Sequence, residues 1–257
     1  METLPSTATT PPAGPAREPR RLAAGQGAEF WSEAWRIFTA APLIWILILI
    51  IYVCISIVLV MIPVIGSVAH TILMPVFMGG LMLGCHALAR GDPLTVGHLF
   101  EGFKNGRFGP LAVVGLILLA LTIVLGLLVV AAAFVTIGMS GIGALMDYTN
   151  PRAYAAMAGA GVGVFFLLLI ALVGVALIWM AFWFAPALVA IDGREPVAAM
   201  KASFDASMAN IMPFLIYSLI YIGLAIAASI PFGLGWLVLV PMIVGTCYAS
   251  WRQVFGA

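Results

Sequence analysis

The positions of the basic residues constrain this chain more than any other feature. Six long apolar segments divide the sequence, and all but one of its eleven Lys and Arg residues lie on the same side of those segments. The exception is Arg152, between the third and the fourth segment. Basic residues in short loops resist transfer across a membrane and stay in the cytoplasm. The asymmetry predicts a polytopic membrane protein with both termini in the cytoplasm.

The composition agrees with a membrane protein. The chain is 64% hydrophobic and 8% charged, with a mean hydropathy of +1.18, whereas soluble domains carry about 25% charged residues. The formal net charge of +1 gives no reason to expect a nucleic-acid partner. The expected partner is the lipid bilayer. Contact with another membrane protein and the oligomeric state are left open.

Six apolar runs are long enough to cross a bilayer core, which takes about 20 residues of helix. They are Pro42–Ile62, Ser67–Ala89, Pro110–Ile137, Ala155–Ala190, Ile211–Ile230 and Leu234–Trp251. The fourth run is too long for one straight crossing, and we expect Pro186 to bend it close to Trp183. Gly138–Tyr154 is the only external connection long enough to form a substantial loop.

The N-terminal residues differ in composition from the rest of the chain. Residues 1–27 are rich in Pro, Ala, Thr and Gly and have almost no large apolar side chains. Such a segment cannot bury enough apolar surface to offset the entropy that ordering costs. We therefore expect a disordered cytoplasmic tail over residues 1–27 and a transmembrane domain over residues 28–257.

Three cytoplasmic segments, Ala28–Phe38, Pro93–Phe108 and Pro196–Asn210, place apolar residues at helical spacing on one face and charged residues on the other. Amphipathic helices of this kind lie in the membrane interface. Six aromatic residues are the candidate membrane-interface anchors: Phe30, Trp31, Trp35, Phe100, Phe103 and Phe204. In Pro196–Asn210 we also expect Val197, Met200 and Met208 on the apolar face.

Each amphipathic segment is followed by a proline that opens an apolar run (Pro42, Pro110 or Pro213) and then by a pair of runs joined by a turn. The predicted fold is therefore all-α, with six transmembrane helices and three amphipathic cytoplasmic interfacial helices. Their order suggests a three-fold repeat of interfacial helix, span, turn and span. Few residues are identical between the copies, so the repeat is one of architecture.

Several stretches, taken in order, resemble a proteobacterial family of uncharacterised six-span inner-membrane proteins. They are residues 30–38 (FWSEAWRIF), 41–45 (APLIW), 73–85 (LMPVFMGGLMLGC), 89–94 (ARGDPL), 97–103 (GHLFEGF), 183–190 (WFAPALVA) and 200–204 (MKASF). More distantly, the chain is similar to the membrane domain of some glycerophosphodiester phosphodiesterases. The resemblance implies the bacterial inner membrane and the six-span topology. It transfers no catalytic residue, because hydrolysis in those enzymes belongs to a separate soluble domain.

Short motifs add little chemistry to this picture. Gly80 with Gly84, and Gly159 with Gly163, form GxxxG pairs, which let helices pack closely. Gly138–Gly141 matches the G-x-S-G pattern of rhomboid proteases, but only an unusual dyad of Ser140 with His70 could activate that serine. We find no metal-ligand set, phosphate loop or acid–base pair, and expect no cofactor, no metal and no catalytic residue.

Two functional hypotheses follow. The first is a non-catalytic inner-membrane protein that contacts lipids or a partner protein through its cytoplasmic interfacial helices. The second is an uncoupled permease or exporter of an apolar small solute, with a cavity lined by residues such as Ser218 and Tyr221. No charged residue lies centrally in any apolar run, although ion-coupled carriers usually hold one there.

Overall fold

The computed structural model describes residues 18–146 and 151–256; of residues 137–146, 151–158 and 160 it describes only the backbone. The described chain consists of helices joined by short turns, and it contains no strand. The α-helices are α1 (Gln26–Ala40), α2 (Pro42–Val60), α3 (Ile65–Ala89), α4 (Phe108–Met146), α5 (Pro151–Trp183), α6 (Ala185–Ala190), α7 (Pro196–Ala209), α8 (Ile211–Ser229) and α9 (Trp236–Phe255), and the 3-10 helix is η1 (Val96–Phe103). The expected all-α fold is confirmed.

Five stretches of helix in the described residues are long and apolar enough to cross a membrane, which makes this a polytopic membrane protein. They are Pro42–Val60, Ile65–Ala89, Phe108–Thr136, Gly161–Ala190 and Ile211–Ser229. The expected sixth span corresponds to α9, whose C-terminal half carries polar residues such as Thr246, Ser250 and Arg252. The total of six spans therefore stays a prediction.

The elements follow the expected order of three units: α1–α2–α3, η1–α4–α5 and α7–α8–α9. The middle unit differs from the other two. Its interfacial element is a 3-10 helix of 8 residues, and α4 and α5 have 39 and 33 residues. At 1.5 Å per residue, α4 is far longer than the bilayer core requires.

The expected external loop Gly138–Tyr154 is wrong for most of its length. Helix α4 continues to Met146, and α5 begins at Pro151. A helix can include glycines at a modest cost in free energy when apolar neighbours stabilise it. Proline suits the first position of α5, because a residue there needs no hydrogen-bonded N–H. Asp147 and Asn150, expected in this loop, lie outside the described residues.

The bend expected near Pro186 is confirmed, and Ser203 of α7 explains how it is stabilised. Helix α5 ends at Trp183 and α6 starts at Ala185. The Phe184 N–H donates to Ser203 Oγ at 2.9 Å, and the Ser203 hydroxyl donates to the Met180 carbonyl at 2.8 Å. The serine thus satisfies the donor and the acceptor that would have paired with each other in an unbroken helix.

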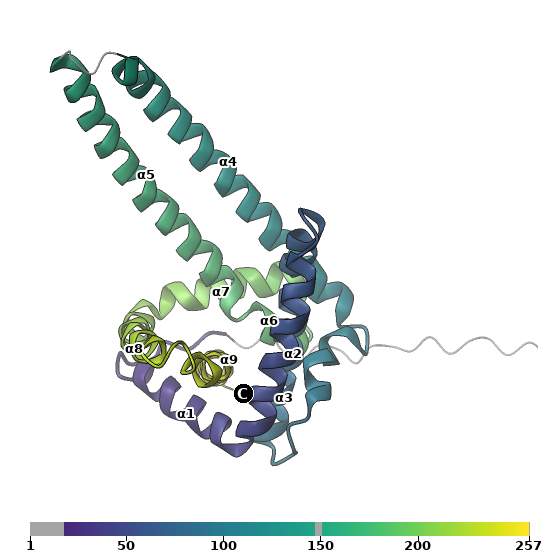
Figure 1. Ribbon diagram of the computed structural model, residues 1–257. Helices are drawn as coiled ribbons and strands as arrows, with labels where there is room; N and C mark the ends of the chain where they lie inside the picture. The colour runs from purple at the N-terminus through teal and green to yellow at the C-terminus, as the bar shows by residue number, and fades with distance from the viewer. Residues whose placement is uncertain (1–17, 147–150, 257) are drawn as a thin grey trace, which may run out of the picture.

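A compact group of helices and a projecting pair make up the molecule. In Figure 1, α4 and α5 lie side by side and extend away from the other helices, while α8 and α9 are seen nearly end-on beside α1. Helix α1 packs on α9 and α8, and α3 contacts α4, η1, α6 and α9. Most of the largest fully buried side chains belong to the compact group, among them Trp45, Trp251, Tyr248, Phe30 and Phe184.

The last part of the expected tail makes specific contacts with this group. The Arg20 N–H donates to the Val254 carbonyl at 2.8 Å. Asn210, which is 1% exposed, accepts from the Leu22 N–H at 2.7 Å and donates to the Arg20 carbonyl at 3.0 Å. The segment before α1 is therefore attached to α9 and to the end of α7. Residues 1–17 lie outside the described residues.

Candidate functional site

The six candidate anchors occupy two different environments. Phe30 and Trp31 are 1% and 6% exposed, and the Trp31 ring stacks on Tyr217 of α8 with centroids 5.0 Å apart. These two residues pack inside the protein, since α1 places its apolar face against α8 and α9 rather than against lipid. Trp35, at 50% exposed, Phe100 and Phe103 are accessible, and Phe204 is half-buried.

Helix α7 buries a different face from the expected one. Its buried residues include Ala199, Ser203, Ala206 and Ser207, whereas Val197 and Met208 are exposed and only Met200 of the expected apolar set is buried. The reason is the broken end of α5: Met180 accepts hydrogen bonds from both serine hydroxyls. Small side chains let α7 come close enough to make these bonds.

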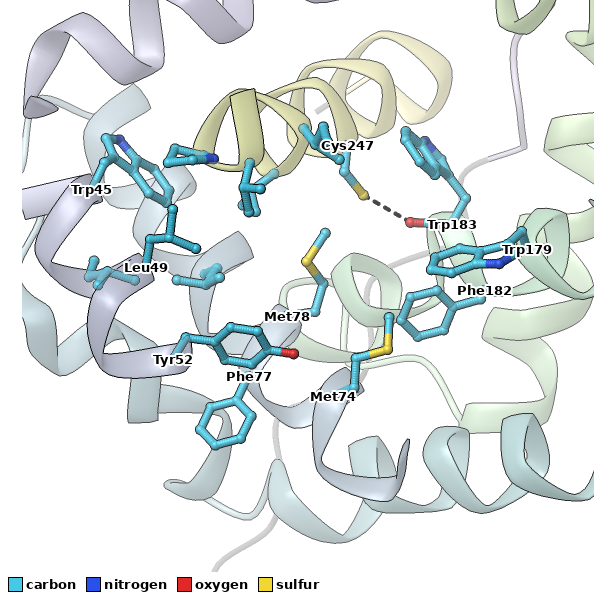
Figure 2. A pocket seen from close by; sticks show the side chains of 16 residues that line it. Trp45, Leu49, Tyr52, Met74, Phe77, Met78, Trp179, Phe182, Trp183 and Cys247 are labelled. Carbon is cyan, nitrogen blue, oxygen red and sulfur yellow. Dashed lines mark hydrogen bonds between the residues drawn. The ribbon is translucent and has the colours of Figure 1, made fainter. Parts of the chain in front are cut away.

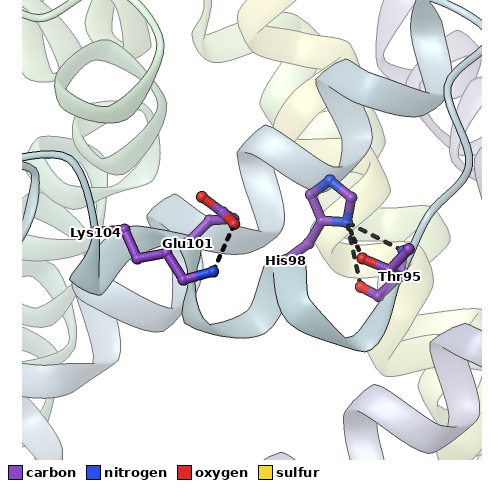
Figure 3. A network of polar contacts seen from close by, with 4 residues as sticks. All are labelled: Thr95, His98, Glu101 and Lys104. Carbon is purple, nitrogen blue, oxygen red and sulfur yellow. Dashed lines mark hydrogen bonds and ion pairs between the residues drawn. The ribbon is translucent and has the colours of Figure 1, made fainter.

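The η1 segment uses its polar residues to stabilise itself. The Thr95 N–H donates to His98 Nδ1 at 3.1 Å, which forms half of a capping box, and Lys104 Nζ donates to Glu101 at 3.0 Å (Figure 3). No group of three His, Cys, Asp or Glu side chains suited to a metal ion occurs in the described residues. His98 is therefore a helix-capping residue.

The glycine pairs pack in different ways. A Cβ on Gly84 would lie 2.8 Å from Leu94, and one on Gly80 would lie 3.0 Å from the Leu99 carbonyl oxygen. Both glycines therefore allow η1 and the residues just before it to pack closely on α3. Gly163 of α5 faces Thr136 of α4, whereas a Cβ on Gly159 would meet nothing within 4 Å.

The expected alternative dyad finds no support in the contacts of its histidine. His70 Nε2 lies 3.3 Å from the hydroxyl of Tyr52 on α2, with which it forms a hydrogen bond. The side chain of Ser140 lies outside the described residues.

An apolar cavity in the compact group is the best candidate for a functional site. Its volume is about 210 Å³, and it lies between α2, α3, α9 and the C-terminal end of α5 (Figure 2). It is lined by Trp45, Ile48, Leu49, Tyr52, Met74, Phe77, Met78, Leu81, Trp179, Phe182, Trp183, Val240, Pro241, Ile243, Val244 and Cys247. None of these lining residues is Asp, Glu, Lys, Arg or His.

Three polar groups in the cavity wall are already bound to the protein. Trp45 Nε1 donates to the Ile37 carbonyl at 3.1 Å, and Trp183 Nε1 donates to Ser250 Oγ at 3.0 Å. Cys247 Sγ donates to the Trp183 carbonyl at 2.9 Å, as the dashed line in Figure 2 shows. These three groups are not available to a ligand, so the part of the cavity around them offers dispersion contacts and burial of apolar surface.

Trp179 and Trp183 separate this cavity from a second one of about 320 Å³, which they also line. Trp183 is held by its hydrogen bond to Ser250 and by edge-to-face contacts with Phe214 and Tyr217, whose ring centroids lie 5.8 and 5.4 Å from that of Trp183. Ser218 lines the second cavity, while Tyr221 lines a separate groove between α8 and α9. The two residues expected to line one cavity therefore lie at different sites.

Comparison with known proteins agrees with this picture. The model of the family described as "Protein of unknown function (DUF975)" matches residues 35–255. The chain belongs to this family. A probable inner membrane protein of Burkholderia thailandensis is 27% identical over 266 residues, covering 91% of this chain and 93% of that protein. No solved structure matches the chain.

The comparisons confirm the expected kind of family, an uncharacterised one with a relative named as an inner membrane protein. The resemblance to the membrane domain of glycerophosphodiester phosphodiesterases stays a prediction. The aromatic cavity was not anticipated from the sequence. Its lining comes from four helices distant in the chain, and each contributes ordinary apolar residues, so only the spacing of Trp179 and Trp183 on one helix face gave a signal.

Proposed function

We propose that this protein is a non-catalytic inner-membrane protein that binds lipid, holding an apolar chain in the cavity between α2, α3, α5 and α9. The carrying observation is the cavity wall, in which aromatic, Met and aliphatic side chains surround about 210 Å³ and the polar groups named above are already paired. An apolar cavity of about 150 Å³ in a soluble protein stays dry and takes up benzene. A cavity somewhat larger suits a segment of one hydrocarbon chain.

The cytoplasmic face supports the same proposal. Trp35, Phe100 and Phe103 are exposed apolar side chains on the side where the basic residues gather. Aromatic residues at this level anchor a protein among lipid headgroups. We propose these three residues as membrane-interface anchors. Binding of another membrane protein to this face is the competing interpretation. Both assign the N and C termini to the cytoplasm.

Native mass spectrometry of the protein in mild detergent tests the cavity. We expect one retained lipid class in the wild type and its loss in Val244→Phe, because the added phenyl group fills the cavity. Val175→Phe is the matched control, since Val175 is 44% exposed on α5 and does not line the cavity. Equal retention by both variants, or no retained lipid in the wild type, would contradict the proposal.

An uncoupled permease or exporter of an apolar small solute is the second candidate. It is favoured by the position of the cavity among helices long enough to cross the membrane and by its uncharged lining. Flux of an apolar dye across proteoliposomes distinguishes the two. A permease gives flux that depends on the protein and that Val244→Phe stops, whereas a lipid-binding protein leaves the flux at the level of empty liposomes.

A further inference from the structure

The cavity adjoins a groove that contains polar side chains. Tyr52 lines the cavity and also lines the groove between α2 and α3. The other residues along the groove are Val53, Ser56, Ile57, Val60, Met61 and His70. A molecule that lies along both would therefore pass the Tyr52 side chain.

Tyr52 and His70 form a polar pair at this junction. The hydroxyl and Nε2 are 3.3 Å apart, and the rings are tilted with centroids 6.2 Å apart. Ser56 Oγ is bound to the Tyr52 carbonyl at 2.8 Å, and the Tyr52 ring makes an edge contact with Phe77 at 5.5 Å. Ionisable side chains inside membrane helices are costly, and they commonly mark binding or transport sites.

We infer that the Tyr52–His70 pair binds the head of a long-chain carboxylic acid whose hydrocarbon chain enters the apolar cavity. The inference rests on the proposed function, because it assigns the head of the ligand whose chain occupies the cavity. A carboxyl group both donates and accepts hydrogen bonds, or only accepts them when ionised, and an imidazole beside a phenol matches either form.

The lining of the groove favours a carboxylic acid over a phospholipid as the ligand. The groove is lined in the described structure by no Lys or Arg, so a phosphate head would lack a cation to balance its charge. A carboxyl head is neutral when protonated and then needs no such cation.

Quenching of tryptophan fluorescence by dibromostearic acid tests the inference, since Trp45, Trp179 and Trp183 line the cavity. The full-length protein in detergent is titrated with the acid and, separately, with its methyl ester, which cannot donate and carries no charge. We expect the wild type to bind the acid about tenfold more tightly than the ester, the value of one hydrogen bond to a charged group.

The variants separate the head from the chain. His70→Ala should weaken binding of the acid to the level of the ester and leave the ester unchanged, while His70→Gln, which keeps a hydrogen-bonding group, should recover part of the difference. Equal binding of acid and ester by the wild type would overturn the assignment of the head and leave the proposed function standing. If brominated stearyl alcohol binds as tightly as the acid, the assignment of the head is also overturned.

The cavity itself has a separate readout in the same assay. Val244→Phe should abolish quenching by both acid and ester, whereas Val175→Phe should retain it. If Val244→Phe binds both ligands as the wild type does, the proposed function fails, whatever His70→Ala shows. If Val244→Phe abolishes binding but His70→Ala binds the acid as tightly as the wild type does, the inference about the head fails and the proposed function stands.

Discussion

Helices α3 and α5 are both apolar enough to cross a membrane, yet they face different surroundings. In the most apolar window of Ile65–Ala89, 56% of residues are buried inside the protein, against 6% in Gly161–Ala190. Helix α3 carries the small residues Gly79, Gly80 and Gly84, and α5 carries exposed Phe165, Phe166 and Leu168. Small residues let helices approach one another, whereas large aliphatic and aromatic ones fill the space beside lipid tails.

The difference teaches that the most apolar helices of this protein are not its core. Helix α9 has many buried residues, such as Tyr248, Trp251 and Phe255, and it is the expected span that is not apolar enough to be recognised as one. In water, apolar residues collect inside; in a bilayer, lipid tails accept them just as well, so apolar character alone does not mark the protein interior.

The largest effect is expected from a charged residue on the projecting pair α4 and α5, where it would test whether these helices face lipid. Leu127 of α4 is 65% exposed, and we expect Leu127→Arg to reduce membrane insertion by about 2.5–3.5 kcal/mol, because arginine would enter the hydrocarbon core. An insertion assay based on glycosylation measures this cost.

Val197→Arg is the control, because Val197 is 68% exposed on α7, a helix expected outside the bilayer core. It should insert normally. If both variants insert equally well, α4 does not face lipid at this level.

A branched side chain at Gly80 should destabilise the compact group by about 1–3 kcal/mol. A Cβ there would lie 3.0 Å from the Leu99 carbonyl oxygen and 3.1 Å from the Gly102 nitrogen, and backbone atoms cannot move aside easily. Thermal unfolding in detergent compares Gly80→Val with Gly126→Val of α4, where a Cβ meets nothing within 4 Å. A similar loss in both variants would mean that helix propensity alone sets the cost.

Ser203→Ala should cost about 1–2 kcal/mol, because it removes the acceptor of the buried Phe184 N–H. Ser218→Ala is the matched control, since Ser218 is exposed and donates only to the Phe214 carbonyl of its own helix. Chemical unfolding in detergent measures both. An unchanged stability for Ser203→Ala would show that the break between α5 and α6 does not depend on α7.

The smallest effect concerns two ion pairs. Arg252 pairs with Glu33, whose side chain is 12% exposed, whereas Arg90 and Asp92 form an exposed pair at 3.5 Å. We expect Arg252→Gln to cost about 1 kcal/mol, since hydrogen bonds between charged groups are the stronger ones, and Arg90→Gln to cost less than about 0.5 kcal/mol. Thermal unfolding at low and high salt tests the ranking, and a larger loss for Arg90→Gln would reverse it.

The sequence alone predicted the all-α membrane fold, the order of its elements and the break near Pro186, because hydropathy and proline act locally. It could not predict which face of an amphipathic helix meets the protein. Phe30 and Trp31 have the same character as Trp35, and only the packing of α1 on α8 and α9 separates them. Likewise, no local sequence pattern indicated that Ser203 would form hydrogen bonds with the backbone groups left unpaired at the end of α5.

The most direct test of the central claim is an experimental density map of the wild-type protein in lipid nanodiscs. We predict an elongated density between Trp45, Met78 and Cys247, surrounded by the helices that form the cavity. Side chains that close this space, with no density between them, would contradict the account.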